Sequence, residues 1–218
     1  ACARNWRAML EARRARLTDF DGLRGYPLRR ELHEAQRYQS IADYDPARCA
    51  DVLGTLGETM QVPTLRLNAF YHSRPFEDKA FEHALLGLPE SVRARWRYDV
   101  EALREPGREW DLRFANWSLG LVGDMHAVDI PIAAGTDTPI RLAIPGESLH
   151  RELELLVESG LSPQDAIFAA TIAPARFFGL DAQMGRILEG QRADLVLLRA
   201  NPLETIRNTR EIQGVVAA

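Results

Sequence analysis

Cysteine is scarce in this sequence of 218 residues, and lysine is nearly absent. The two cysteines, Cys2 and Cys49, are too few and too far apart for a metal-binding knuckle, and the sequence alone does not establish a cross-link between them. The single lysine, Lys79, lies in a stretch without a regular pattern. A cysteine-based metal site is therefore excluded. The compartment is left open, with the cytoplasm as the default.

Long apolar runs and an excess of basic residues are also missing. No apolar run approaches the roughly 18 residues that a membrane-spanning helix needs, so no membrane partner is expected. Acidic residues number 31 against 27 basic ones, and the formal net charge of −4 indicates no nucleic-acid partner. The first residues contain neither an initiator methionine nor an apolar signal core. The composition is that of an ordinary globular protein without low-complexity segments.

The most informative stretch runs from residue 128 to residue 160. Residues 128–134 form a short apolar run with β-branched side chains, which predicts a buried strand. The run ends in Gly135-Thr136-Asp137-Thr138-Pro139, which is typical turn chemistry. An amphipathic helix is predicted from Glu147 to Gly160. In α/β barrels the reactive groups lie just past the carboxyl ends of strands, so Asp137 is the candidate catalytic residue.

Further motifs follow in a fixed order. Residues 162–165 predict a helix start, with Ser162 as cap, Pro163 at the first position and Asp165 in the first turn. Residues 185–198 predict a hairpin that leads into a strand. The sequence resembles the C-terminal half of the amidohydrolase superfamily, near imidazolonepropionase-like and prolidase-like metal-dependent hydrolases. The matching segments are residues 134–137, 145–153, 169–176 and 190–198.

This resemblance implies a fold, a cofactor and a role for Asp137. Members of the superfamily form a (β/α)8 barrel of the TIM type with a small β-sandwich built from both chain ends. They hold one or two divalent metals, for which zinc is favoured, between a His-x-His pair, further histidines, often a carboxylated lysine, and an aspartate after strand 8. Only the aspartate has a counterpart here, at Asp137, since the five histidines are scattered singly. The resemblance therefore assigns to Asp137 the roles of metal ligand and general base, and implies that the chain is the C-terminal part of a barrel enzyme.

The same topology sorts the other polar residues. Barrel strand 7 is predicted at residues 61–67 and strand 8 at residues 128–134, with a helix at residues 112–126 between them. Residues 68–74 then lie on the rim that carries the chemistry, and His150 opens the helix after strand 8. The candidates for substrate contact are therefore Tyr71, His72, Arg74 and His150.

The rest of the chain is assigned in outline. Helices are predicted at residues 5–17, 28–41 and 46–60, with Asp45 capping the third. Short β runs at residues 194–199 and 212–217 are assigned to the sandwich. Residues 1–180 are thus expected to be the C-terminal part of an α/β barrel, and residues 181–218 the C-terminal strands of the sandwich.

The predicted function is hydrolysis of C–N bonds in amides or cyclic amides by the intact, metal-dependent enzyme, with the isolated chain inactive. The substrate is expected to be a small molecule or peptide-like, and the chain to be completed by its missing N-terminal half-barrel or by another subunit. Two alternatives remain open: a deaminase-type member of the same superfamily, and a non-catalytic half-barrel that serves binding or assembly.

Overall fold

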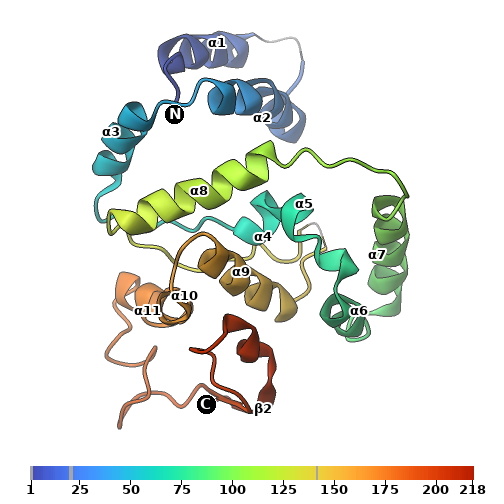
Figure 1. The fold of residues 1–218 in the computed structure, drawn as a ribbon, viewed down its shortest axis with the longest axis vertical. Coiled ribbons are helices and arrows are strands. Elements are labelled where there is room, and N and C mark those ends of the chain that lie inside the picture. Colours follow the sequence, from blue (N-terminus) through green and yellow to red (C-terminus); the bar gives the residue numbers. More distant parts are fainter. Residues whose placement is uncertain (1, 20–21, 141) are drawn as a thin grey trace. The chain divides into compact units, whose positions relative to one another are not determined.

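The computed structural model describes residues 2–19, 22–140 and 142–218, and it divides the chain into two compact units (Figure 1). Unit 1 comprises residues 1–58 and unit 2 comprises residues 59–218. This division differs from the expected boundary at residue 180, which separates barrel from sandwich and stays a prediction. Among the described helices, none combines the length and the apolar character needed to cross a membrane.

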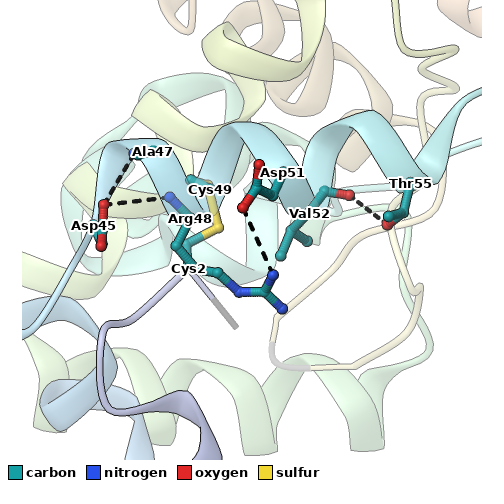
Figure 2. The surroundings of a disulfide bond; sticks show 8 residues. All are labelled: Cys2, Asp45, Ala47, Arg48, Cys49, Asp51, Val52 and Thr55. Atoms are coloured by element: carbon teal, nitrogen blue, oxygen red, sulfur yellow. Dashed lines mark hydrogen bonds and ion pairs between the residues drawn. A yellow bond between two sulfur atoms is a disulfide. The ribbon is translucent and has the colours of Figure 1, made fainter.

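Unit 1 consists of the three helices that the sequence predicts. They are α1 (Trp6–Thr18), α2 (Gly25–Ala42) and α3 (Pro46–Leu56). The third begins as expected, because the Asp45 side chain accepts hydrogen bonds from the backbone N–H groups of Ala47 and Arg48 (Figure 2). It ends four residues earlier than predicted, at Leu56, where Gly57 adopts a positive φ of 47°.

A disulfide bond joins the start of the chain to α3, a link that the sequence left undecided. Cys2 and Cys49 are both buried, and their sulfur atoms are bonded (Figure 2). The neighbouring backbone strengthens the same connection, since Ala3 and Tyr44 form an isolated antiparallel bridge. The first residues of unit 1 are thereby tied to the helix that ends it.

Unit 2 is mostly helical. The sequence-predicted helix at residues 112–126 is confirmed as α8, and the one from Glu147 is confirmed as α9. The predicted helix start at Ser162 is also confirmed, because Ser162 and Asp165 form a reciprocal capping box. The helical elements of unit 2 are α4 (Leu65–Asn68), α5 (Phe70–Ser73), η1 (Pro75–Glu77), α6 (Lys79–Leu85), α7 (Glu90–Leu103), α8 (Arg113–Ala127), α9 (Glu147–Glu158), α10 (Pro163–Ala170), α11 (Ile172–Phe177) and η2 (Ile206–Arg210).

The two predicted barrel strands are largely wrong in extent. Of residues 61–67 and 128–134, only Gln61 and Ile132 pair, in a single parallel bridge. Left-handed backbone at Thr64 (φ 48°) and at Asp129 (φ 58°) interrupts each extended run. Residues 65–68 are helical instead, as α4. The parallel direction agrees with neighbouring barrel strands, but a barrel is not formed by the described residues.

Two apolar clusters form the core of unit 2. The first lies between α4, α8, α9 and α10, and includes Ile132 from the bridged segment and Ile206 from η2. The second gathers the aromatic residues Phe70, Phe76 and Phe81 around α5, η1 and α6. The first cluster therefore surrounds the segments that lead to Asp137.

The C-terminal β runs are confirmed as an antiparallel pair. Strands β1 (Leu195–Leu198) and β2 (Ile212–Val216) pair with Leu195 opposite Val216, and a register shift lies between Leu197 and Leu198. The two form a sheet of two strands among the described residues, so a sandwich is not confirmed.

Helices α8 and α9 approach each other closely at Gly123. A Cβ atom added there would lie 2.4 Å from the backbone carbonyl oxygen of Ser159, which follows α9. We expect Gly123→Ala to lower the free energy of unfolding by about 1–3 kcal/mol, because the two helices must move apart.

The matched control is Gly120→Ala on the same helix, where an added Cβ would meet no atom within 4 Å. This change should raise stability by up to about 1 kcal/mol through helix propensity alone. Urea unfolding of both variants measures the difference. Equal stabilities would contradict the close approach of α8 and α9.

Candidate active site

Asp137 lies in the loop that follows the bridged segment of unit 2. Its side chain is exposed, and its backbone is left-handed, with φ 51°, a conformation that aspartate tolerates better than most residues. The hydroxyl oxygens of the flanking Thr136 and Thr138 lie 2.8 Å apart, within hydrogen-bond distance. The loop thus presents the carboxylate to solvent just past Ile132, on the side of the bridge that the sequence indicated.

The buried side chain of Arg66 holds this loop. Arg66, on α4, is only 4% exposed. Its Nε donates to the carbonyl oxygen of Thr136, and its Nη2 donates to that of Ile140 at 2.6 Å, with a longer contact of 3.5 Å to that of Asp137. One guanidinium therefore fixes both ends of residues 136–140, which matches the rigid, forked donor geometry of arginine.

Glu152 in turn holds the start of α4. This residue of α9 is fully buried, and its two carboxylate oxygens accept hydrogen bonds from the backbone N–H groups of Leu65, at 2.9 Å, and Arg66, at 2.6 Å. Burial raises the pKa of Glu152 to about 7, although these two hydrogen bonds and the charge of Arg66 act in the opposite direction. Asp137, Arg66 and Glu152 are thus connected through the backbone of two segments.

The structure gives the predicted substrate residues near α5 other contacts. Tyr71 stacks on Trp110, with ring centroids 4.5 Å apart. His72 forms a hydrogen bond with Glu158 at the end of α9. Arg74, which has a left-handed backbone, pairs with Glu77 at 3.3 Å. These three side chains thus meet three different partners, and the contacts do not gather them around Asp137.

His150 likewise has a structural partner. Its Nδ1 lies 2.9 Å from the hydroxyl oxygen of Thr209 on η2. Burial is the main cause that lowers the pKa of His150, and the nearby charge of Arg210 acts in the same direction. The lowered pKa disfavours the charged form of the imidazole, and the residue connects the start of α9 to η2.

An ion-pair network lies on a partly buried side of α9. Arg151 pairs with Asp78 at 2.8 Å and with Glu154 at 2.7 Å, and Arg210 pairs with Glu147 and Glu154. A hydrogen bond from the backbone N–H of Ala80 is the main cause that lowers the pKa of Asp78. The network joins α6, α9 and η2, and it leaves Glu152 on the buried side of the helix.

The described residues do not by themselves fit a divalent metal site. Catalytic zinc sites use three protein ligands, whereas no group of three or more His, Cys, Asp or Glu side chains lies close enough to hold a metal within the ranges described. Asp137 is the single ligand that the resemblance assigns to this part of the chain.

Comparison with known proteins relates part of this chain to a family. Residues 120–218, which contain Asp137 and Glu152, match the model of the Amidohydrolase family. Over these residues the chain is similar to members of that family. The segment identified in this way begins within α8 and runs to the end of the C-terminal strand pair.

Relatives of this chain include an ochratoxinase and an adenine deaminase. An ochratoxinase of Aspergillus niger is 39% identical over 88 residues, which are 39% of this chain and 17% of the relative. An adenine deaminase of Ligilactobacillus salivarius is 31% identical over 144 residues, which are 66% of this chain and 23% of the relative. The chain thus spans less than a quarter of the length of either relative.

Solved structures show the same fold. A putative prolidase from Bifidobacterium longum aligns with 77% of this chain and 38% of its own, with a TM-score of 0.51 and 25% identity. A Xaa-Pro dipeptidase aligns with 80% of this chain and 36% of its own, with a TM-score of 0.51 and 22% identity. The mixed arrangement of helices and strands in this chain is therefore similar to part of the fold of these two proteins.

Sequence reasoning missed Arg66 and Glu152, although both carried a signal. Glu152 stands on the apolar face of α9, beside Leu153 and Leu156, where a charged residue is out of pattern. Arg66 stands between two leucines in a segment predicted to be a barrel strand. A buried charge needs a partner, so these two residues could have been proposed as a pair.

The raised pKa of Glu152 predicts a pH-dependent stability. Its pKa is about 7 in the folded protein against an ordinary 4.5, so between these values the folded state binds more protons than the unfolded state. The stability contributed by protonated Glu152 is therefore complete below about pH 4.5 and is lost as the pH rises through about 7.

Glu152→Gln removes this titration. At about 1.4 kcal/mol per unit of pKa difference, the wild type should lose up to about 3 kcal/mol more stability than the variant as the pH is raised across this range. Urea unfolding of both proteins at pH 5 and pH 8 measures the effect. Parallel pH profiles would show that Glu152 does not titrate in this range.

Proposed function

We propose that this chain is the C-terminal part of a metal-dependent amidohydrolase that hydrolyses C–N bonds in amides or cyclic amides. In the whole protein, Asp137 serves as metal ligand and general base, and residues outside this chain supply the other ligands. The observation that carries the proposal is the exposed Asp137 carboxylate in a loop whose backbone is fixed by the buried Arg66. Zinc is the proposed metal, with one or two ions in the whole protein.

The chemistry that this chain can contribute is proton transfer. C–N hydrolysis requires a group that accepts a proton from the attacking water and passes a proton to the leaving nitrogen. An exposed carboxylate on a fixed loop meets both requirements, because its position is set by the backbone while its oxygens stay accessible. Arg66 fixes that backbone by binding the carbonyl groups of Thr136 and Ile140.

Substrate contacts are proposed for Tyr71, His72, Arg74 and His150. Three of them lie on or next to α5, which follows α4 directly, and His150 lies on α9, the helix that carries Glu152. Each would have to exchange its present partner, such as Glu77 for Arg74, for a group of the substrate. The proposed substrate is a small molecule or a peptide-like compound.

The proposed partner of this chain is the rest of its own barrel, either in the same polypeptide or in another subunit. Support comes from the single bridge between Gln61 and Ile132, which leaves both segments without further strand neighbours among the described residues. Unpaired strand edges favour pairing with other strands. The short share of each relative that the chain covers supports the same proposal.

Deamination is the second candidate function. Adenine deaminases from three bacteria match this chain, and one of these matches covers 66% of the length of this chain. Deamination and amide hydrolysis both break a C–N bond, and both suit a general base at Asp137. The third candidate is a non-catalytic assembly module. It would be favoured if the whole wild-type protein showed no activity.

Localisation in the cytoplasm stays a prediction. Disulfide bonds persist mainly in oxidising compartments and are rare in the cytosol. The bond between Cys2 and Cys49 therefore weighs against the cytoplasmic default.

Asp137→Asn in the whole protein tests the proposed function. The change keeps the shape and the tolerance for left-handed backbone but removes the charge and the basic oxygen. Loss of a general base typically costs about 10²- to 10⁴-fold in rate, and we expect kcat to fall by that factor. Turnover of an Xaa-Pro dipeptide, an N-acyl amino acid and adenine, together with metal content, provides the measurement and separates hydrolysis from deamination.

Asp129→Asn is the matched control. Asp129 is also exposed and left-handed, with φ 58°, and it lies on the other side of the bridged segment. We expect wild-type activity from this variant. Near-normal activity and metal content in Asp137→Asn would show that Asp137 is neither ligand nor base.

A further inference from the structure

The buried pair Glu152 and Arg66 has a geometry that points beyond structural support. Both side chains form hydrogen bonds with backbone groups of other segments. Glu152 accepts from two successive N–H groups, and Arg66 donates to carbonyl groups at both ends of the Asp137 loop. The two sets of bonds meet at Arg66, whose N–H is held by Glu152 and whose side chain holds the loop.

From this geometry we infer that Glu152 and Arg66 are positioning residues for Asp137. Glu152 fixes the first turn of α4, α4 fixes the guanidinium of Arg66, and the guanidinium fixes the backbone of residues 136–140. The inference rests on the proposed function, because it assigns these residues a role in the rate of the reaction that Asp137 serves.

Arg66 holds the loop through its backbone. Its guanidinium binds the carbonyl oxygens of Thr136 and Ile140, which stand on either side of Asp137 in the sequence. Lysine at position 66 could not reproduce this, since it is a point charge without a planar fork.

The alternative is that the pair contributes only general stability to α9. The ion pairs on the opposite side of the same helix provide the comparison. Glu154 pairs with Arg151 within α9 and with Arg210 on η2, and neither of these contacts involves α4. Glu154→Gln therefore removes a partly buried carboxylate from α9 without touching the connection to Asp137.

The test uses Glu152→Gln, Arg66→Lys and the control Glu154→Gln in the whole protein. In Glu152→Gln, the new amide side chain has one acceptor oxygen for two N–H donors, so the first turn of α4 loses a partner. Changes in residues that orient a catalytic ligand typically cost about 10- to 100-fold in activity. We expect kcat to fall by that factor in both test variants, with KM close to that of the wild type, and wild-type kcat in the control.

Amide hydrogen exchange provides a readout that does not depend on activity. Arg66→Lys should speed exchange in residues 136–140 and leave the N–H groups of residues 65 and 66 protected, because Glu152 still binds them. Glu152→Gln should speed exchange in both segments. Glu154→Gln should change neither. This order of effects would support a connection that runs from Glu152 through Arg66 to the loop.

Three results would overturn the inference. The first is unchanged exchange at residues 136–140 in folded Arg66→Lys protein, and the second is faster exchange there with wild-type kcat. The third is an equal loss of kcat in Glu154→Gln, which would indicate general destabilisation. If Glu152→Gln does not fold, Arg66→Lys decides alone. If the wild-type protein cleaves none of the substrates, the proposed function fails, and the exchange pattern still decides whether the pair fixes the loop.

Discussion

The arrangement of unit 2 depends on the hydrogen bonds between the buried carboxylate of Glu152 and the first backbone N–H groups of α4. Removing a carboxylate from water costs several kcal/mol, and hydrogen bonds to a charged group return about 1.5–3 kcal/mol each. Here the acceptor oxygens are used on the two N–H groups that begin α4. The first N–H groups of a helix have no acceptor within that helix. Glu152 supplies the acceptors for α4, and α4 supplies the donors for the buried carboxylate. Helix α9 is joined in this way to a segment 86 residues earlier in the chain.

Positive charge at Arg66 completes this balance. The guanidinium is buried beside the carboxylate, where its charge favours the ionised form of Glu152, and its donors are used on loop carbonyl groups. Burial outweighs these favourable contributions and leaves the pKa of Glu152 near 7. The core of the folded protein therefore contains an acidic group that changes its charge near neutral pH. Arg66 links this group to the loop that carries the proposed base.

Local patterns are sufficient for the helix starts and for the C-terminal strand pair, but insufficient for the two barrel strands. Asp45 with Pro46, and Ser162 with Asp165, mark helix starts correctly, because capping involves residues only two or three positions apart. The same reasoning extends a strand through Leu65, where the backbone is helical. Pairing of barrel strands depends on neighbours that are distant in sequence, and the two predicted strands are joined by a single bridge among the described residues.

The candidate site shows the same contrast. Order and spacing along the chain single out Asp137, which lies exposed past Ile132, and its role as ligand and base stays a prediction. Partners such as Trp110 for Tyr71 and Thr209 for His150 could not be predicted, because nothing in either local sequence specifies them. The charged pair at Arg66 and Glu152 was within reach of the sequence, since each interrupts an apolar pattern.

The disulfide in unit 1 has a practical consequence for the site in unit 2. Both cysteines of the chain, Cys2 and Cys49, are consumed in one bond, and residues 59–218 contain no cysteine. A cysteine introduced into the Asp137 loop would therefore be the sole reactive thiol of this chain under non-reducing conditions. A spin label or fluorophore attached there would report on the loop alone, without removal of any native residue elsewhere.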